Sequence, residues 1–139
     1  MSEKIENYLI PYATYTDPEI ATVGHNEKTL RALDIPFDVY AKHFNHNDRA
    51  LCDSNEGVYK IYTAKGKDKI LGASLAGGPA GDIIGLIGNA MTNKIGLKKL
   101  GSCTFPYPSY AEIFRNMSDS YIKSTITPGM KKVIKMIYL

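Results

Sequence analysis

The chain has 139 residues, with 17 Lys and Arg against 14 Asp and Glu, and 44% of its residues are hydrophobic. These values are typical of a single globular domain and exclude a disordered, collagen-like or coiled-coil chain. The net charge of +3 is spread along the sequence, without a basic patch interleaved with aromatic residues, so no nucleic-acid partner is expected.

The first third of the chain predicts two short strands and a helix. Aromatic and β-branched residues dominate the first strand, and Pro11 restricts it to an edge or irregular strand. Asn26 is suited to cap the helix, which Pro36 ends. The predicted elements are a strand at 8–16, a turn at 17–19, a strand at 20–23 and a helix at 27–33.

Three strands are predicted in the middle of the chain, and the last two form a hairpin. The loop at 65–68 has the length and the glycine typical of a hairpin connection. Val58, Ile61 and Leu71 are the hairpin residues expected to face a core, and residues 45–48 have turn composition. The predicted strands cover residues 39–44, 57–63 and 69–75.

Helices dominate the last third of the chain. A glycine-rich bend at 77–81 precedes an apolar helix, in which Gly85 and Gly88 cost about 1 kcal/mol each relative to Ala. Glycines at such positions indicate the close approach of another backbone. Two prolines and Ser109, as N-cap, hold an exposed loop at 103–109 directly before a helix. The predicted segments are a helix at 82–93, a short segment at 97–100, a helix at 110–124 and a short helix from about 127 to the end.

This order of elements indicates an α+β domain. Strands come first, then one helix, three more strands and finally helices. The arrangement predicts an antiparallel sheet of about five strands with helices packed on one side.

The sequence lacks the usual motifs for a metal, a phosphate or a covalent nucleophile. The bend at 77–81 has neither G-x-G-x-x-G nor G-K-[ST], and Asp82 places negative charge where a phosphate would bind. His43 and His46 could ligate one metal only on a helix, whereas their segment has strand and turn composition. The sequence has no G-x-S-x-G motif, so a self-contained covalent enzyme is not expected.

The cysteines and the apolar segments indicate a cytoplasmic location. Cys52 and Cys103 lie far apart and outside any C-x-x-C motif, and lone thiols are typical of a reducing compartment. The N-terminus carries no export signal. The longest apolar stretch, at 83–90, is shorter than the roughly 20 residues of a membrane span, so no membrane contact is expected.

The remaining candidate site is the segment 105–112, a proline-stiffened loop followed by the first turn of a helix. It presents Tyr107 and places Glu112 in that turn. A stiff loop loses little entropy when it inserts into another surface. The alternative is that Glu112 only complements the helix dipole and Tyr107 only packs.

Four blocks of the sequence together resemble the C-terminal dimerisation domain of the FAD-dependent pyridine nucleotide-disulfide oxidoreductases. This family includes dihydrolipoamide dehydrogenase, glutathione reductase and mercuric reductase. The order and spacing of the blocks, which span most of the chain, carry the resemblance. The blocks are PYATYTDPEIATVG at 11–24, NDRA at 47–50 with GVYK at 57–60, ILGA at 70–73 with AGD at 80–82, and FPYPSYAE at 105–112.

The resemblance implies a homodimer in which the loop before the last long helix enters the partner's active site beside the flavin. In most members a histidine before the final proline of this loop, with a glutamate five residues later, relays protons for a dithiol. Glu112 occupies the glutamate position, and Tyr107 stands where most members have the histidine. The resemblance therefore implies Tyr107 and Glu112 as catalytic residues, and Tyr107 and Pro108 beside the cofactor.

The tyrosine is similar to that of the mercuric reductase loop, which helps to position the metal ion. Those reductases end in a pair of cysteines, whereas this chain ends in Lys135-Met136-Ile137-Tyr138-Leu139. We therefore expect a parent oxidoreductase that resembles dihydrolipoamide dehydrogenase or mercuric reductase, with an unassigned substrate and either NAD or NADP.

The sequence contains neither the G-x-G-x-x-G turns nor the C-x-x-x-x-C motif of the family's FAD- and NAD(P)-binding domains. We therefore expect residues 1–139 to form a single dimerisation domain, with a linker at 1–9. The chain alone is expected to bind no FAD or NAD(P) and to be inactive, whereas the parent enzyme uses both cofactors and contributes the domains that bind them.

The apolar helix at 82–93, with Ile83, Ile84, Leu86 and Ile87, is the candidate for much of the dimer interface. Ile87→Asp is then expected to give a soluble monomer. The alternative is an independent interaction module, without catalysis, that binds a protein or small ligand through the same apolar face.

Overall fold

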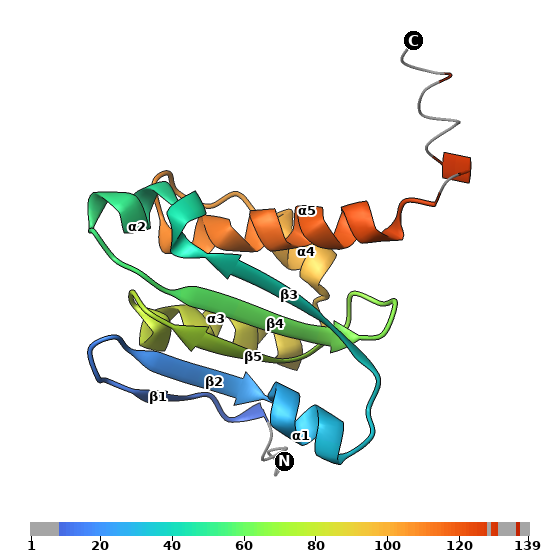
Figure 1. Ribbon diagram of the computed structural model, residues 1–139, viewed down its shortest axis with the longest axis horizontal. Coiled ribbons are helices and arrows are strands. Elements are labelled where there is room, and N and C mark those ends of the chain that lie inside the picture. Colours follow the sequence, from blue (N-terminus) through green and yellow to red (C-terminus); the bar gives the residue numbers. More distant parts are fainter. Residues whose placement is uncertain (1–8, 128, 131–135, 137–139) are drawn as a thin grey trace.

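The computed structural model describes residues 9–127, 129–130 and 136 (Figure 1). The predicted linker at 1–9 and the helix predicted from 127 onward fall almost wholly outside these residues. The predicted strands and longer helices occur in the expected order, and two short helices that were not predicted lie between the third and the fourth strand. The elements are β1 (Tyr12–Thr14), β2 (Ile20–Gly24), α1 (Glu27–Ala32), β3 (Phe37–His43), η2 (Phe44–His46), α2 (Asp48–Cys52), β4 (Val58–Ala64), β5 (Ile70–Ala76), α3 (Ala80–Thr92), α4 (Leu97–Gly101), η3 (Tyr110–Glu112) and α5 (Ile113–Thr125).

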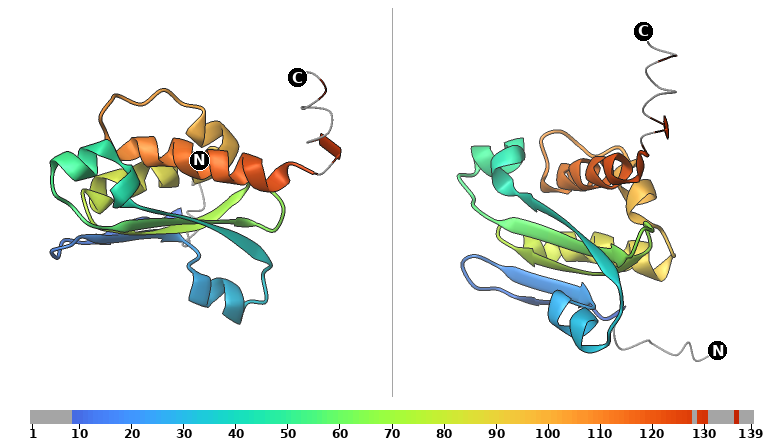
Figure 2. Two further views of the ribbon diagram at one scale, coloured as in Figure 1. Left: turned by 45° about the horizontal axis from the view of Figure 1, so that its top comes forward. Right: turned by 45° about the vertical axis from the view of Figure 1, so that its right-hand side comes forward.

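The five strands form one antiparallel sheet in the order β1-β2-β5-β4-β3. β5 lies in the middle, where Ala73 pairs with Val23 of β2 on one side and with Ile61 of β4 on the other. Helices α3, α4 and α5 cover one face, and α1 lies at one end of the sheet on the opposite side (Figure 2). The predicted α+β fold with a five-stranded antiparallel sheet is therefore confirmed.

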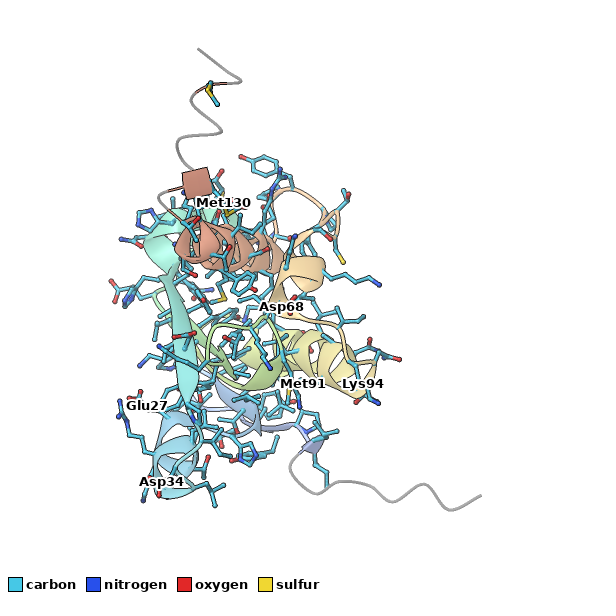
Figure 3. All side chains as sticks on the ribbon, turned by 90° about the vertical axis from the view of Figure 1, so that its right-hand side faces the viewer. Glu27, Asp34, Asp68, Met91, Lys94 and Met130 are labelled. Atoms are coloured by element: carbon cyan, nitrogen blue, oxygen red, sulfur yellow. The ribbon has the colours of Figure 1, made fainter. Side chains whose placement is uncertain are left out.

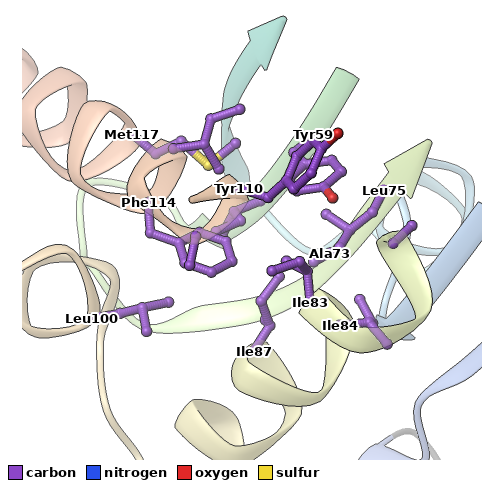
Figure 4. Packing of buried hydrophobic residues seen from close by; sticks show 14 of the residues in the cluster. Tyr59, Ala73, Leu75, Ile83, Ile84, Ile87, Leu100, Tyr110, Phe114 and Met117 are labelled. Carbon is purple, nitrogen blue, oxygen red and sulfur yellow. The ribbon is translucent and has the colours of Figure 1, made fainter. Parts of the chain in front are cut away.

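The core lies between the sheet and the layer of α3 and α5 (Figure 4). Phe114 and Met117 of α5 are fully buried, as are Tyr59 and Ile61 of β4. Tyr40 of the edge strand β3 stacks edge-to-face on Tyr121 at a centroid distance of 5.8 Å, which holds α5 against that edge. This packing fixes the start of α5, and with it the loop that precedes the helix.

Three of the four apolar residues of α3 that were expected at the dimer interface are buried within the chain itself. Ile83, Ile84 and Ile87 are 9%, 3% and 0% exposed, because they pack on the chain's own sheet. Of the four apolar residues, only Leu86 points outward, at 42% exposure. The helical period places Ile83, Ile84 and Ile87 on one face and Leu86 outside it.

The hairpin prediction is correct for Ile61 and wrong for Val58 and Leu71, which are only half-buried. Tyr59 takes the place of Val58, because residues two apart on a strand share a face and Tyr59 lies on the face of Ile61. Leu71 falls where the register shifts, between the pairs of Tyr62 with Gly72 and Thr63 with Ile70.

The predicted close approach at the α3 glycines is absent at Gly85, where no atom lies within 4 Å of the position that a Cβ would take. At Gly88 only side chains lie near, at 3.8 Å or more, so the prediction is wrong there too. A tight contact with the backbone of another helix occurs instead at Gly101 of α4. A Cβ there would lie 2.7 Å from the carbonyl oxygen of Phe114 and 2.2 Å from Cβ of Ser118. Gly101 therefore sets the distance between α4 and α5.

The turn between β4 and β5 is tied to α4. The N–H of Leu97 donates to the carbonyl of Asp68 at 2.8 Å. Figure 3 views this end of the molecule, where Asp68 lies beside α4 and Met91 and Lys94 mark the end of α3. Within the described residues, no helix is long and apolar enough to cross a membrane.

Candidate functional site

The predicted functional loop, residues 103–109, connects α4 to η3 on the helical side of the molecule. Tyr107 is 72% exposed at this loop, and the Tyr107–Pro108 peptide bond is cis. Phe105 packs behind it against the buried ring of Phe114, with centroids 6.1 Å apart. The base of the loop is thus anchored in the core, whereas Tyr107 faces outward.

The hydroxyl of Tyr107 donates a hydrogen bond to Oδ2 of Asp48 at 2.7 Å. Asp48 is the first residue of α2, and both side chains are exposed. A bond of this length to a carboxylate is a charge-assisted hydrogen bond. It links the loop to a helix that lies far from it in the sequence.

This hydrogen bond raises the pKa of Tyr107 above its ordinary value. The bond to Asp48 is the largest cause, followed by the negative charge of Asp48, and Glu112 adds a smaller contribution. The phenol therefore stays protonated at neutral pH and does not act as a base.

Glu112 lies in the last position of η3, and its carboxylate Oε2 accepts the backbone N–H of Ser109 at 3.1 Å. The carboxylate thus satisfies a backbone donor at the start of the helical segment, as in a capping box. Among the described residues, no hydrogen bond joins Glu112 to Tyr107. Tyr107 in the loop and Glu112 in the following η3 therefore do not form a direct relay.

Asn47, the N-cap of α2, holds the end of the loop. Its Oδ1 accepts the N–H of Ala50 at 3.0 Å, and its Nδ2 donates to the carbonyl of Ser109 at 2.9 Å. The residue is only 3% exposed, so both bonds are shielded from water. One side chain therefore caps α2 and fixes the backbone directly before η3.

The other end of α2 holds Tyr110, the residue after the loop. Its hydroxyl donates to Oδ2 of Asp53 at 3.0 Å and accepts from Nδ2 of Asn55 at 2.5 Å. Burial is the largest cause of the raised pKa of Tyr110. Arg49 donates to the same carboxylate at 2.8 Å, and this bond, with that of Tyr110, lowers the pKa of Asp53.

Sequence reasoning missed this role of α2, because residues 45–48 were predicted as a turn. Two local signals were present in the sequence. Asn47 is a preferred N-cap, and Arg49 and Asp53 have the i, i+4 spacing of a helical ion pair. A helix of five residues is too short for periodicity to reveal it.

A hollow of about 700 Å³ does not include the loop. It lies beyond α2, between the turn before β2 and the starts of η2 and β4, and its lining includes Pro18, Phe44, Leu51 and Val58. A polar groove of about 510 Å³ runs beside the loop, lined in part by Asp48, with Lys42 and Lys123 at its wall. Because the groove carries both acidic and basic side chains, it does not favour a ligand of either charge.

The described residues hold no group of three or more His, Cys, Asp or Glu that could bind a metal. The glycine-rich bend does not cradle a phosphate either. The N–H of Gly81 at the start of α3 donates to the carboxylate of Glu19 at 2.9 Å, so a carboxylate already occupies the position of an anion. The bend is thus a structural turn, as predicted.

The arrangement can present a neutral phenol on a rigid support. Tyr107 is the protruding group, Glu112 and Asn47 hold the backbone behind it, and Asp48 holds its hydroxyl. Such a loop suits insertion into the surface of another molecule, because few of its groups need to be ordered on contact.

Several known proteins are similar to this chain. Residues 10–118 match the family described as "Pyridine nucleotide-disulphide oxidoreductase, dimerisation domain". A dihydrolipoyl dehydrogenase of Buchnera aphidicola subsp. Baizongia pistaciae is 33% identical over 129 residues, covering 92% of this chain and 27% of the relative. A soluble pyridine nucleotide transhydrogenase of Vibrio parahaemolyticus is 36% identical over 118 residues, covering 79% of this chain and 25% of the relative. The chain spans about a quarter of the length of these relatives.

Solved structures share the fold. LpdA from Mycobacterium tuberculosis superposes with a TM-score of 0.77 at 21% identity, covering 89% of this chain and 27% of that chain. The Cu(II) complex of the HOCl-induced flavoprotein disulfide reductase RclA from Escherichia coli has a TM-score of 0.74 at 22% identity, covering 80% and 25%. At these identities the likeness concerns architecture alone.

Proposed function

This chain belongs to the dimerisation-domain family of the pyridine nucleotide-disulphide oxidoreductases, and we propose that it forms the two-fold interface of an FAD- and NAD(P)-dependent enzyme. In that enzyme it supplies Tyr107 and Glu112 to the active site of a second copy. The chain alone is catalytically inactive in this proposal, and the parent enzyme works in the cytoplasm. The family match disfavours the alternative of an independent interaction module.

The observation that carries the proposal is the protruding, braced loop. Tyr107 is 72% exposed, yet its hydroxyl is fixed by Asp48, and the carbonyl of Ser109 is fixed by the buried Asn47. An exposed aromatic side chain on a rigid loop resembles the aromatic anchors that dominate protein interfaces. The loop is thus suited to reach into a neighbouring subunit.

The residues of this chain fit a flavin only as an edge contact. Tyr107 and Pro108 offer an aromatic ring and a proline at the outer end of the loop. The carboxylate of Glu19 at the start of α3 leaves no free phosphate cradle there. We therefore place the binding of both cofactors in other domains of the parent enzyme, where a bound flavin would supply the electron transfer.

Within the partner's site, the proposed role of Tyr107 is to orient a reacting group and not to remove its proton. Its pKa is raised by the bond to Asp48, so the phenol stays neutral. Glu112 keeps the loop in place through the N–H of Ser109 and adds negative charge behind the phenol. In this proposal, Tyr107 and Glu112 have separate roles and do not pass a proton directly between them.

We propose that the uncovered face of the sheet adds to the contact between two copies, beside the contact that the loop makes on the helical side. A row of uncharged residues crosses it, since Ile20 pairs with Ala76, and Ala76 pairs with Val58. Ile20 is 50% exposed, and Tyr12 and Val39 on the same face are 64% and 41% exposed. Exposed apolar surface of this kind is typical of an interaction site. The hollow beside Val58 and Ala76 continues this surface.

Sedimentation equilibrium of the purified chain at micromolar concentration tests the dimer. We expect a species of about 31 kDa, twice the 15.4 kDa of one chain. Ile20→Asp is expected to shift it toward the monomer, because dimerisation would bury the new carboxylate.

Leu86→Asp is the matched control, because Leu86 has a similar exposure of 42% but lies on α3, outside the uncovered face of the sheet. The control should stay dimeric. A wild-type chain that sediments as a monomer would contradict an interface formed by this domain alone, and a dimer lost only in Leu86→Asp would place the contact on α3.

A further inference from the structure

Helix α2 is connected to the loop at three separate side chains. At its start, Asn47 binds the carbonyl of Ser109, and at its end Asp53 accepts the hydroxyl of Tyr110. Between these anchors, Asp48 accepts the hydroxyl of Tyr107. The first two contacts fix the backbone on which Tyr107 stands, so Asp48 lies in a defined position relative to the phenol.

We propose that Asp48 is a positioning residue for Tyr107, which makes the phenol oxygen a hydrogen-bond acceptor for the group that it meets in the partner subunit. This inference rests on the proposed role of Tyr107 at a second copy. It assigns to α2 a function beyond packing and adds a residue to the site.

The direction of the hydrogen bond determines which groups the phenol oxygen of Tyr107 can bind. An ionised carboxylate can only accept, so the single O–H proton of Tyr107 must point toward Asp48. The oxygen's remaining lone pairs then face away from α2. A tyrosine held in this way accepts from a donor such as a thiol S–H or an amide N–H, and it has no second proton to donate to another anion.

Among the described residues, the hydrogen bond to Asp48 is the one that holds the phenol of Tyr107. Tyr107 is 72% exposed, and an exposed tyrosine exchanges freely between its staggered rotamers. Without this bond, its hydroxyl would donate or accept as the surroundings required. Fixing a group before contact reduces the entropy that is lost when it engages a target.

The test is the titration of Tyr107 in the full chain. Tyrosine labelled with ¹³C at Cζ gives one NMR signal for each tyrosine, and Tyr107→Phe identifies the signal of Tyr107 by its loss. Asp48→Asn keeps the size of the side chain and removes its charge. We expect the pKa of Tyr107 to shift downward in Asp48→Asn, and to stay raised in Asp48→Glu, which keeps a carboxylate.

Asp53→Asn is the matched control, because it removes a carboxylate from the other end of α2. We expect it to lower the pKa of Tyr110, to which Asp53 binds, and to leave the pKa of Tyr107 unchanged. A merely structural role of Asp48 would alter the melting temperature without moving the titration of Tyr107.

The proposal is overturned if Tyr107 titrates at the same pH in the wild type and in Asp48→Asn. Should Asp48→Asn not fold, Asp48→Ala provides the same comparison. The titration is a property of a single chain, so it separates this inference from the dimer. If the chain fails to dimerise but Asp48→Asn shows the pKa shift of Tyr107, Asp48 remains a positioning residue. The proposed interface is then rejected.

Discussion

Nδ2 of Asn47 donates to the carbonyl oxygen of Ser109 at 2.9 Å, across 62 positions of sequence. The same side chain caps α2 through the N–H of Ala50. Because Asn47 is only 3% exposed, water cannot replace either bond. One buried amide thus joins the helix that carries Asp48 to the loop that carries Tyr107.

Asn47→Ala is expected to destabilise the domain by about 2 kcal/mol. The change removes an N-cap, worth roughly 1 kcal/mol, and leaves the Ser109 carbonyl without its donor, which costs about 1 to 3 kcal/mol when the group is buried. Urea unfolding followed by circular dichroism measures the difference. Asn45→Ala, at an exposed position two residues earlier, should change the free energy of unfolding by no more than about 0.5 kcal/mol.

Ile87→Asp is expected to abolish cooperative folding instead of giving a soluble monomer. Ile87 is 0% exposed between α3 and the sheet, so the carboxylate would be buried without a partner. The loss should exceed about 4 kcal/mol. Leu86→Asp, at the neighbouring outward position, should keep a cooperative transition. A folded Ile87→Asp monomer would show that α3 does not pack as observed.

Two glycine-to-alanine substitutions should change the stability of the domain in opposite directions. Gly85→Ala places a methyl group where no atom lies within 4 Å, so it is expected to stabilise the domain by roughly 0.5 to 1 kcal/mol through helix propensity. Gly101→Ala brings a Cβ to 2.7 Å from the carbonyl oxygen of Phe114 and should destabilise the domain. Thermal unfolding of the two variants tests this. Equal effects would contradict the close approach of α4 and α5.

Stability should fall in acid partly because of Asp38. Its carboxylate accepts the N–H of Gly66 at 2.7 Å, and this bond, followed by that of Lys65, lowers the pKa of Asp38. A lowered pKa contributes stability above the unfolded value of about 3.9, and this contribution is lost as the pH falls through the folded pKa.

Asp38→Asn is therefore expected to lower the free energy of unfolding at pH 7 by roughly 0.5 to 1 kcal/mol. Between neutral and acidic pH, the free energy of unfolding should also fall less in the variant than in the wild type. Chemical unfolding at a series of pH values measures both. Asp34→Asn, at an exposed position, is the control. An unchanged pH profile in Asp38→Asn would contradict the assignment.

The sequence alone determined the elements that depend on local chemistry. Asn26 caps α1 as predicted, and its side chain accepts the N–H of Thr29 at 2.9 Å. The glycine-containing loop at 65–68 located the hairpin, and prolines with Ser109 located the exposed loop. Each of these signals acts within a few residues, so the sequence displays it directly. The family resemblance then implied catalytic roles for Tyr107 and Glu112.

Only the tertiary structure decided which apolar residues are buried within the chain and which residues form hydrogen bonds with the loop. An apolar helix face looks the same in sequence whether it packs on its own sheet, as Ile87 does, or on a second molecule. The bonds of Asn47 with Ser109 and of Asp48 with Tyr107 span 62 and 59 positions. Such contacts depend on how the sheet and α5 bring distant segments together, and no local pattern encodes that distance.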